Sequence, residues 1–197
     1  MELVLVRHAD AWADEEARRL GEFDAPLSDR GRVQCARLAV QLREEPIQVV
    51  VSSPLQRARS TADAIADAHG LAVELIDDLR EIDFGELEGL TYEQVEALWP
   101  ELFAQLMQAP TTVRFPRGES YQDLRRRVAT VTAGLRRRYE GELVVAVTHG
   151  GVIRAALADA LGMSDGAVFR FAVDTASVTR LAWLESGVLV RSINFVT

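Results

Sequence analysis

The chain begins with a short apolar run at residues 3–6, and Arg7 and His8 follow it directly. The run is built from leucine and valine and is too short to cross a membrane. Continuous apolar runs of this kind suit strands that are buried on both faces of a parallel sheet. Because binding and catalytic residues of open α/β sheets lie beyond the carboxyl ends of such strands, Arg7 and His8 are predicted to lie in a functional site.

Strand-like and helix-like segments alternate along the rest of the chain. Strands are expected at residues 47–51, 71–76, 143–147, 168–173, 178–184 and 188–195, and helices are expected to begin near Ser28, Pro54, Thr91, Ser120 and Gly150. The alternation predicts an α/β fold, a single doubly wound, mostly parallel sheet with helices on both faces, in one domain over residues 1–197. It also places His8 and His149 at the same edge of the sheet.

Composition removes several classes of function. All 22 basic residues are arginine, which excludes a P-loop lysine, a pyridoxal-phosphate Schiff base and a lysine general base. The net charge of −8 argues against binding to nucleic acid or to an anionic membrane. A single cysteine allows no internal disulfide. The absence of a signal-like opening and of a long apolar run leads us to expect a cytoplasmic protein.

The polar residues at the predicted strand ends suit a phosphoryl group. Arg7 and His8 follow the first strand, Arg57 lies one turn into the helix after the second, and His149 comes just before a glycine-rich helix start at Gly150. Guanidinium groups and free backbone N–H groups at a helix N-terminus both bind phosphate oxygens. Other arginines form triplets at residues 125–127 and 136–138, which are expected to be solvated helix faces.

A set of short motifs, in order along nearly the whole chain, resembles the histidine phosphatase superfamily, also called phosphoglycerate mutase-like. The motifs are residues 5–8 (LVRH), 26–31 (PLSDRG) with Gln34, 52–58 (SSPLQRA) with Thr61-Ala62, Glu81 with Phe84-Gly85 and Glu88-Gly89, 118–120 (GES), and 148–151 (THGG). Any one motif alone is weak, and together they are specific.

The resemblance implies a phosphohistidine mechanism without a metal or any other cofactor. His8 would attack phosphorus, Arg7, Arg57 and His149 would hold the phosphoryl oxygens, Glu81 would protonate the leaving alcohol, and Gly21 and Gly150 would lend backbone N–H groups. Guanidinium and imidazolium groups would supply the positive charge. The chain departs from the family at two positions. Ala9 stands where the family usually has glycine, and Asp14 where it often has asparagine.

The implied activity is that of a phosphoric monoester hydrolase acting on a small-molecule phosphate ester. The segment 86–118, the expected substrate-covering insertion, is short and fairly apolar, which favours hydrolysis over mutase-type phosphoryl transfer. Residues 149–154 and 169–174 look similar to α-ribazole phosphatases of cobalamin assembly. Mutase activity, phosphohistidine removal from signalling proteins and non-catalytic binding of a phosphorylated ligand remain as alternatives. The sequence does not predict the oligomeric state.

Overall fold

The structure is a computed structural model that describes residues 1–12 and 20–196. A six-stranded sheet forms its centre, with strand order β3-β2-β4-β1-β5-β6. Its strands are β1 (Glu2–Arg7), β2 (Val49–Ser52), β3 (Val73–Leu75), β4 (Leu143–Thr148), β5 (Val178–Leu184) and β6 (Gly187–Phe195). The first four pair in parallel, and β5 and β6 form an antiparallel hairpin along β1. The predicted mostly parallel α/β fold is confirmed.

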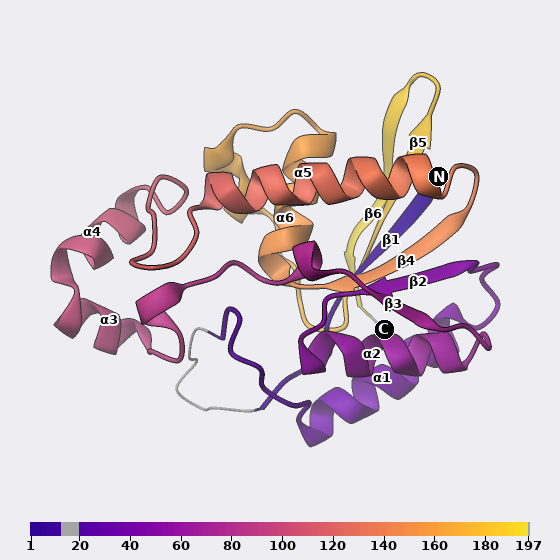
Figure 1. Cartoon of the computed structure of the whole chain (residues 1–197), viewed down its shortest axis with the longest axis horizontal. Helices are drawn as coiled ribbons and strands as arrows, with labels where there is room; N and C mark the ends of the chain where they lie inside the picture. The colour runs from indigo at the N-terminus through magenta and orange to yellow at the C-terminus, as the bar shows by residue number, and fades with distance from the viewer. Residues whose placement is uncertain (13–19, 197) are drawn as a thin grey trace.

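Helices cover both faces of the sheet, as Figure 1 shows. The α-helices are α1 (Asp29–Leu42), α2 (Gln56–Asp67), α3 (Tyr92–Leu98), α4 (Pro100–Gln108), α5 (Tyr121–Arg138) and α6 (Gly150–Ala160). Short 3₁₀ helices are η1 (Asp77–Leu79), η2 (Gly85–Leu87) and η3 (Asp165–Arg170). In Figure 1, α1 and α2 lie below the sheet, α5 and α6 lie above it, and α3 and α4 extend to one side.

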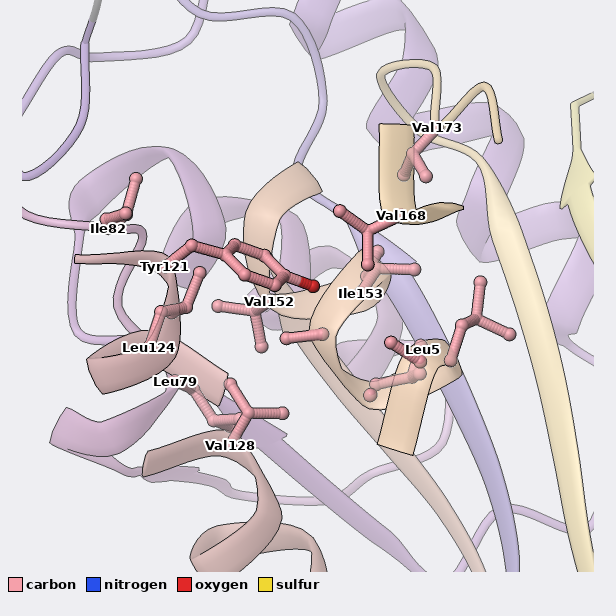
Figure 2. Close-up of a cluster of buried hydrophobic side chains, with 14 of the residues drawn as sticks. Leu5, Leu79, Ile82, Tyr121, Leu124, Val128, Val152, Ile153, Val168 and Val173 are labelled. Carbon is pink, nitrogen blue, oxygen red and sulfur yellow. The ribbon is translucent and has the colours of Figure 1, made fainter. Parts of the chain in front are cut away.

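The apolar run at residues 3–6 is buried because β1 has a core on each face. Leu3 and Leu5 belong to the cluster that includes α5 and α6, and Val4 and Val6 belong to the cluster of α1 and α2. Figure 2 shows part of the first cluster around Leu5. Alternate side chains point to opposite faces of a strand, so a strand between two cores is apolar throughout. This burial fixes β1 and therefore the position of the residues that follow it.

Three helices begin at capping residues that the sequence predicts. Ser28 caps α1 by accepting a hydrogen bond from the Gly31 N–H. Thr91 and Ser120 begin α3 and α5 with complete capping boxes. Each cap satisfies backbone N–H groups that have no partner within the helix, so the cap residue sets where the helix starts.

The strand predicted at residues 168–173 is wrong. This segment is the end of η3 followed by irregular chain. The side of β1 away from β4 is already paired with β5, and two backbone carbonyls of the segment serve arginines instead of a strand ladder. The Phe171 carbonyl accepts from Arg154 Nε at 3.2 Å, and the Val173 carbonyl accepts from Arg7 at 2.5 Å. The segment therefore uses its carbonyls to bind Arg7 and Arg154 instead of pairing as a strand.

Within the described residues, no helix combines the length and the apolar composition needed to span a bilayer.

Candidate active site

Two histidines lie side by side at the carboxyl ends of neighbouring strands. Arg7 at the end of β1 is in register with Thr148 at the end of β4, so the next residues, His8 and His149, meet. Their ring centroids are 5.0 Å apart, and both side chains are buried. The predicted placement of both residues at the same edge of the sheet is confirmed.

The His8 ring is held in one orientation by the backbone beside it. Its Nδ1 lies 2.8 Å from the Ala9 carbonyl oxygen, an acceptor, so Nδ1 carries the proton and Nε2 carries the lone pair. Ala9 is itself buried, and its N–H donates to Thr61 Oγ1 at 3.0 Å. Ala9 is not among the non-glycine residues with positive φ, so alanine fits here without strain.

Arg57 is almost fully buried and donates a hydrogen bond to the unprotonated nitrogen of His8. Its Nε lies 3.3 Å from His8 Nε2, and its terminal nitrogens donate to the Gly21 carbonyl at 2.5 Å and the Phe23 carbonyl at 2.7 Å. The side chain thus connects α2 to the loop around Gly21. We predicted a role for the Gly21 N–H; the structure shows its carbonyl oxygen in contact with the site. A Cβ at Gly21 would lie 2.0 Å from Glu88 Oε1, which explains why glycine fits there.

Arg7 and His149 each have one buried side-chain nitrogen without a hydrogen-bond partner among the described residues. Arg7 donates through one terminal nitrogen to the Val173 carbonyl, and its Nε has no partner. His149 Nε2 lies 2.8 Å from Ser53 Oγ, and its Nδ1 has no partner. Buried polar atoms are nearly always hydrogen-bonded, so these two nitrogens indicate a place for a polar ligand. Gly150 begins α6 beside them.

The Glu81 side chain lies against the first turn of α6. Its two carboxylate oxygens accept hydrogen bonds from the N–H groups of Gly151 and Ile82, each at 3.0 Å. The loop that carries it is held by Arg127 on α5, which donates to the carbonyls of Asp78 and Arg80 at 2.8 and 2.9 Å. Arg127 also forms a two-point ion pair with Glu119, at 3.0 and 2.7 Å. The loop is therefore tied to a rigid helix.

Several positioning residues were missed or misjudged in the sequence. Ser53 was quoted only within the motif at residues 52–58 and was given no role in the site, although its place at the end of a predicted strand was a signal. Arg127 was assigned to a solvated face, which is wrong: its side chain is 16% exposed. Arg125 is likewise half-buried and pairs with Asp165 at 2.5 Å. Arg126 and residues 136–138 are exposed, as predicted.

Burial and neighbouring charges keep both site histidines neutral near pH 7. Burial lowers the pKa of His8 well below 6.5, and the charges of Arg57 and Arg7 lower it further. Burial also lowers the pKa of His149 well below 6.5, with His8, Arg57 and Arg7 adding to the effect. The expected imidazolium at His149 is therefore replaced by a neutral ring. Since Ser53 Oγ can donate to Nε2, the Nδ1 of His149 can keep its proton and act as a donor.

These pKa directions predict an acid-sensitive fold. In the unfolded chain the two histidines take up protons as the pH falls below about 6.5, whereas in the folded protein they do not. The unfolded state then binds more protons, so the free energy of unfolding should fall with pH below 6.5, by up to about 1.4 kcal/mol per pH unit for each histidine. Denaturant unfolding of wild type and His149→Gln between pH 7.5 and 5.5 measures this. Equal slopes for the two proteins would contradict the assignment for His149.

A cavity of about 380 Å³ opens beside the Glu81 carboxylate. Gly151 and Arg154 of α6 contribute to it, and the rest of the wall is mainly aromatic and apolar: Ile82, Phe84, Tyr92, Leu106, Met107, Pro110, Phe115, Tyr121, Leu124 and Phe169. Figure 2 shows Ile82, Tyr121 and Leu124 where this wall meets the core cluster. Trp99, Phe103 and Met107 follow one another at four-residue spacing but do not share one environment. Met107 lines the cavity, whereas Trp99 and Phe103 pack against the core.

The arrangement is that of an anion site next to an apolar pocket. Two guanidinium groups, a neutral imidazole that can donate and the N-terminus of α6 lie near His8, whose Nε2 accepts a hydrogen bond from Arg57 Nε. Such a set can hold a phosphoryl group and stabilise the charge that moves during its transfer. Among the described residues, no cluster of His, Cys, Asp or Glu side chains has the arrangement of a metal site.

Comparison with known proteins decides the family. The model of the histidine phosphatase superfamily, branch 1, matches residues 3–196. The chain belongs to this superfamily. The histidine phosphatase resemblance drawn from the motifs is thus confirmed, and relatives named as phosphatases place the chain among the hydrolases.

Three similar proteins show the range of this histidine phosphatase's relatives. Phosphoserine phosphatase 1 of Hydrogenobacter thermophilus is 34% identical over 194 residues, covering 98% of this chain and 92% of that protein. Phosphoglycerate mutase-like protein 4 of Arabidopsis thaliana is 39% identical over 157 residues, covering 78% of this chain and 68% of that protein. The crystal structure of the α-ribazole phosphatase from Shigella flexneri has a TM-score of 0.91 at 26% identity, covering 99% of this chain and 96% of the other.

The predicted site residues lie together around the ends of β1 and β4. His8, His149, Arg7 and Arg57 form the centre, Glu81 and Gly150 lie at the start of α6, and Gly21 contacts Arg57. Asp14, the second departure from the family pattern, falls outside the described residues.

Proposed function

We propose that this histidine phosphatase hydrolyses a small-molecule phosphate monoester through a phosphohistidine on His8, without a metal. The observation that carries the proposal is the state of His8. Its Nε2 is unprotonated, because Nδ1 faces the Ala9 carbonyl, and it lies 3.3 Å from the Arg57 guanidinium. A nucleophile needs a lone pair, and a phosphoryl group needs cations around its equatorial oxygens.

The reaction would proceed in two displacements at phosphorus. In the first, a bond forms between His8 Nε2 and phosphorus while the bond to the leaving oxygen breaks, and Glu81 gives that oxygen a proton. In the second, Glu81 takes a proton from water, the water oxygen bonds to phosphorus, and the bond to Nε2 breaks. Arg7, Arg57, the Nδ1–H of His149 and the Gly150 N–H would hold the oxygens in both steps.

The cavity next to Glu81 would receive the leaving group. Its aromatic and apolar wall favours an alcohol with some apolar bulk. Tyr92, Leu106, Met107, Pro110 and Phe115 come from residues 86–118, so this insertion would cover the substrate. α-Ribazole 5′-phosphate, whose base is aromatic, is one candidate. The similarity of this fold to that of the Shigella α-ribazole phosphatase supports it. Phosphoserine is another, supported by the Hydrogenobacter relative.

The test is phosphate release from a panel of monoesters with a chelator present. The panel contains α-ribazole phosphate, phosphoserine, 3-phosphoglycerate, sugar phosphates and phenyl phosphate. We expect release that the chelator does not reduce, and a preference for α-ribazole phosphate would place the chain in cobalamin assembly. Interconversion of 2- and 3-phosphoglycerate without release would indicate a mutase instead. Binding without either reaction would indicate a phospho-ligand binding protein.

Glu81→Gln should slow turnover most where the leaving alcohol is a poor one. The amide keeps the shape of the side chain but cannot give up a proton, so general acid catalysis worth about 10²- to 10⁴-fold is lost on alkyl phosphates. A nitrophenyl phosphate, whose leaving group needs no proton, should lose much less. Steady-state kcat/KM on both esters measures the difference. Glu86→Gln, at an exposed position in η2, is the control, and an equal loss on both esters would remove the role proposed for Glu81.

A further inference from the structure

Arg154 of α6 lines the cavity with its charge unpaired. Its Nε donates to the Phe171 carbonyl at 3.2 Å, and its guanidinium carbon lies 5.9 Å from the centre of the Phe169 ring. These two contacts fix the plane of the group. Its terminal nitrogens have no hydrogen-bond acceptor or carboxylate partner in the part of the chain that the structure describes.

The other half-buried arginines show that this is unusual within the molecule. Those with a carboxylate partner are Arg80, Arg125, Arg127 and Arg180, paired with Glu22, Asp165, Glu119 and Glu45. Over residues 1–12 and 20–196, Arg7, Arg57 and Arg154 are the buried or half-buried arginines without one. The first two are the proposed phosphoryl ligands. A partly desolvated cation is costly when unpaired, so a third one in the same region indicates a second anion.

The position of Arg154 indicates a role in the site rather than a purely structural one. A Cβ at Gly150 would lie 3.1 Å from one terminal nitrogen of Arg154 and 3.7 Å from Arg7 Nε. The two guanidinium groups therefore approach the same residue at the start of α6. Arg154 also lines the cavity together with Glu81, the proposed proton donor to the leaving oxygen. It thus lies between the phosphoryl site and the space for the leaving group.

We infer that Arg154 binds a carboxylate on the leaving group and so determines specificity. The preferred substrates are then phosphate monoesters whose alcohol carries a carboxylate close to the ester oxygen, next to an apolar body that contacts the aromatic wall. A guanidinium binds a carboxylate at two points, which fixes the leaving oxygen relative to Glu81. This inference rests on the proposed phosphatase function. It ranks such esters above α-ribazole phosphate, whose leaving group has no carboxylate, and above phosphoserine and 3-phosphoglycerate, whose alcohols carry a carboxylate but no apolar body.

The experiment uses two esters that differ in one charge. We compare kcat/KM for 3-carboxyphenyl phosphate with that for its neutral analogue, 3-carbamoylphenyl phosphate, in wild type, Arg154→Leu and Arg154→Lys. Wild type should prefer the carboxylate ester by about 10- to 100-fold, the range of a charge-assisted hydrogen-bonded pair. Arg154→Leu should bring the ratio close to one, and Arg154→Lys should keep part of it. Arg170→Leu, at an exposed arginine nearby, should leave the wild-type ratio unchanged.

Other results would overturn the inference. Equal losses on both esters in Arg154→Leu would mean that Arg154 holds the phosphoryl group instead. Hydrolysis by wild type with no preference for the carboxylate would refute the inference and leave the phosphatase function intact. No hydrolysis of either ester, nor of phenyl phosphate, would remove both. Thermal unfolding of each variant shows whether a loss reflects the site or the fold.

Discussion

His8→Ala is expected to abolish turnover, with a fall in kcat/KM on the order of 10⁴-fold or more. The alanine removes the proposed nucleophile, and His149 is not placed to replace it because its Nε2 faces Ser53. The substitution breaks one side-chain contact with a neighbouring carbonyl and the contact with Arg57, so the fold should survive. Phosphate release and thermal unfolding, measured together, check both statements.

The third histidine provides the matched control for this result. His69 lies just beyond the end of α2, away from the sheet edge that carries His8. His69→Ala should retain wild-type kcat/KM. If His8→Ala retained substantial activity as well, the phosphohistidine mechanism would be wrong, and the site would have to act through direct attack by water.

Arg57→Ala is expected to reduce both catalysis and stability. The loss of a guanidinium next to the transferred group should lower kcat/KM by about 10³-fold, within the range for such groups. The carbonyls of Gly21 and Phe23 would also lose their donors, which should lower the free energy of unfolding by about 2–4 kcal/mol. Arg57→Lys keeps the positive charge but not the fork geometry, so it should recover part of the activity.

Arg59 lies on the same helix as Arg57 and provides a matched control for Arg57→Ala. Its side chain is 60% exposed, and its Nε is 3.9 Å from Asp63. Arg59→Ala should change the free energy of unfolding by less than about 1 kcal/mol and leave kcat/KM unaltered. Activity in Arg57→Ala within a few-fold of wild type, with the fold intact, would exclude Arg57 from the phosphoryl site.

The centre of the site could be predicted because it depends on local signals. An apolar strand followed by a polar residue identifies a position at the sheet edge without knowledge of the rest of the fold. His8 and His149 both follow such strands, and β1 and β4 are neighbours in the sheet. The glycines after His149 marked the start of a helix, and the resemblance to the family implied the roles.

The supporting residues could not be predicted because their roles depend on long-range packing. Arg127 belongs to a triplet typical of a helix surface, and only the approach of the loop around Glu81 buries it against Glu119. The segment at 168–173 has the apolar content of a strand, yet its carbonyls hold Arg7 and Arg154. These contacts leave no local pattern, since Arg127 and Arg80 are 47 residues apart in the chain and Arg7 and Val173 are 166 residues apart.

The most direct test of the central claim is to trap the covalent intermediate. Wild-type protein is mixed with ³²P-labelled phenyl phosphate, quenched within one turnover in alkali, which preserves phosphohistidine, and digested for peptide mapping. The mechanism predicts label on the peptide that contains His8, stable in alkali, lost in acid and absent from His8→Ala. Rapid phosphate release with no labelled peptide in repeated quenches, or label on a residue other than His8, would contradict it.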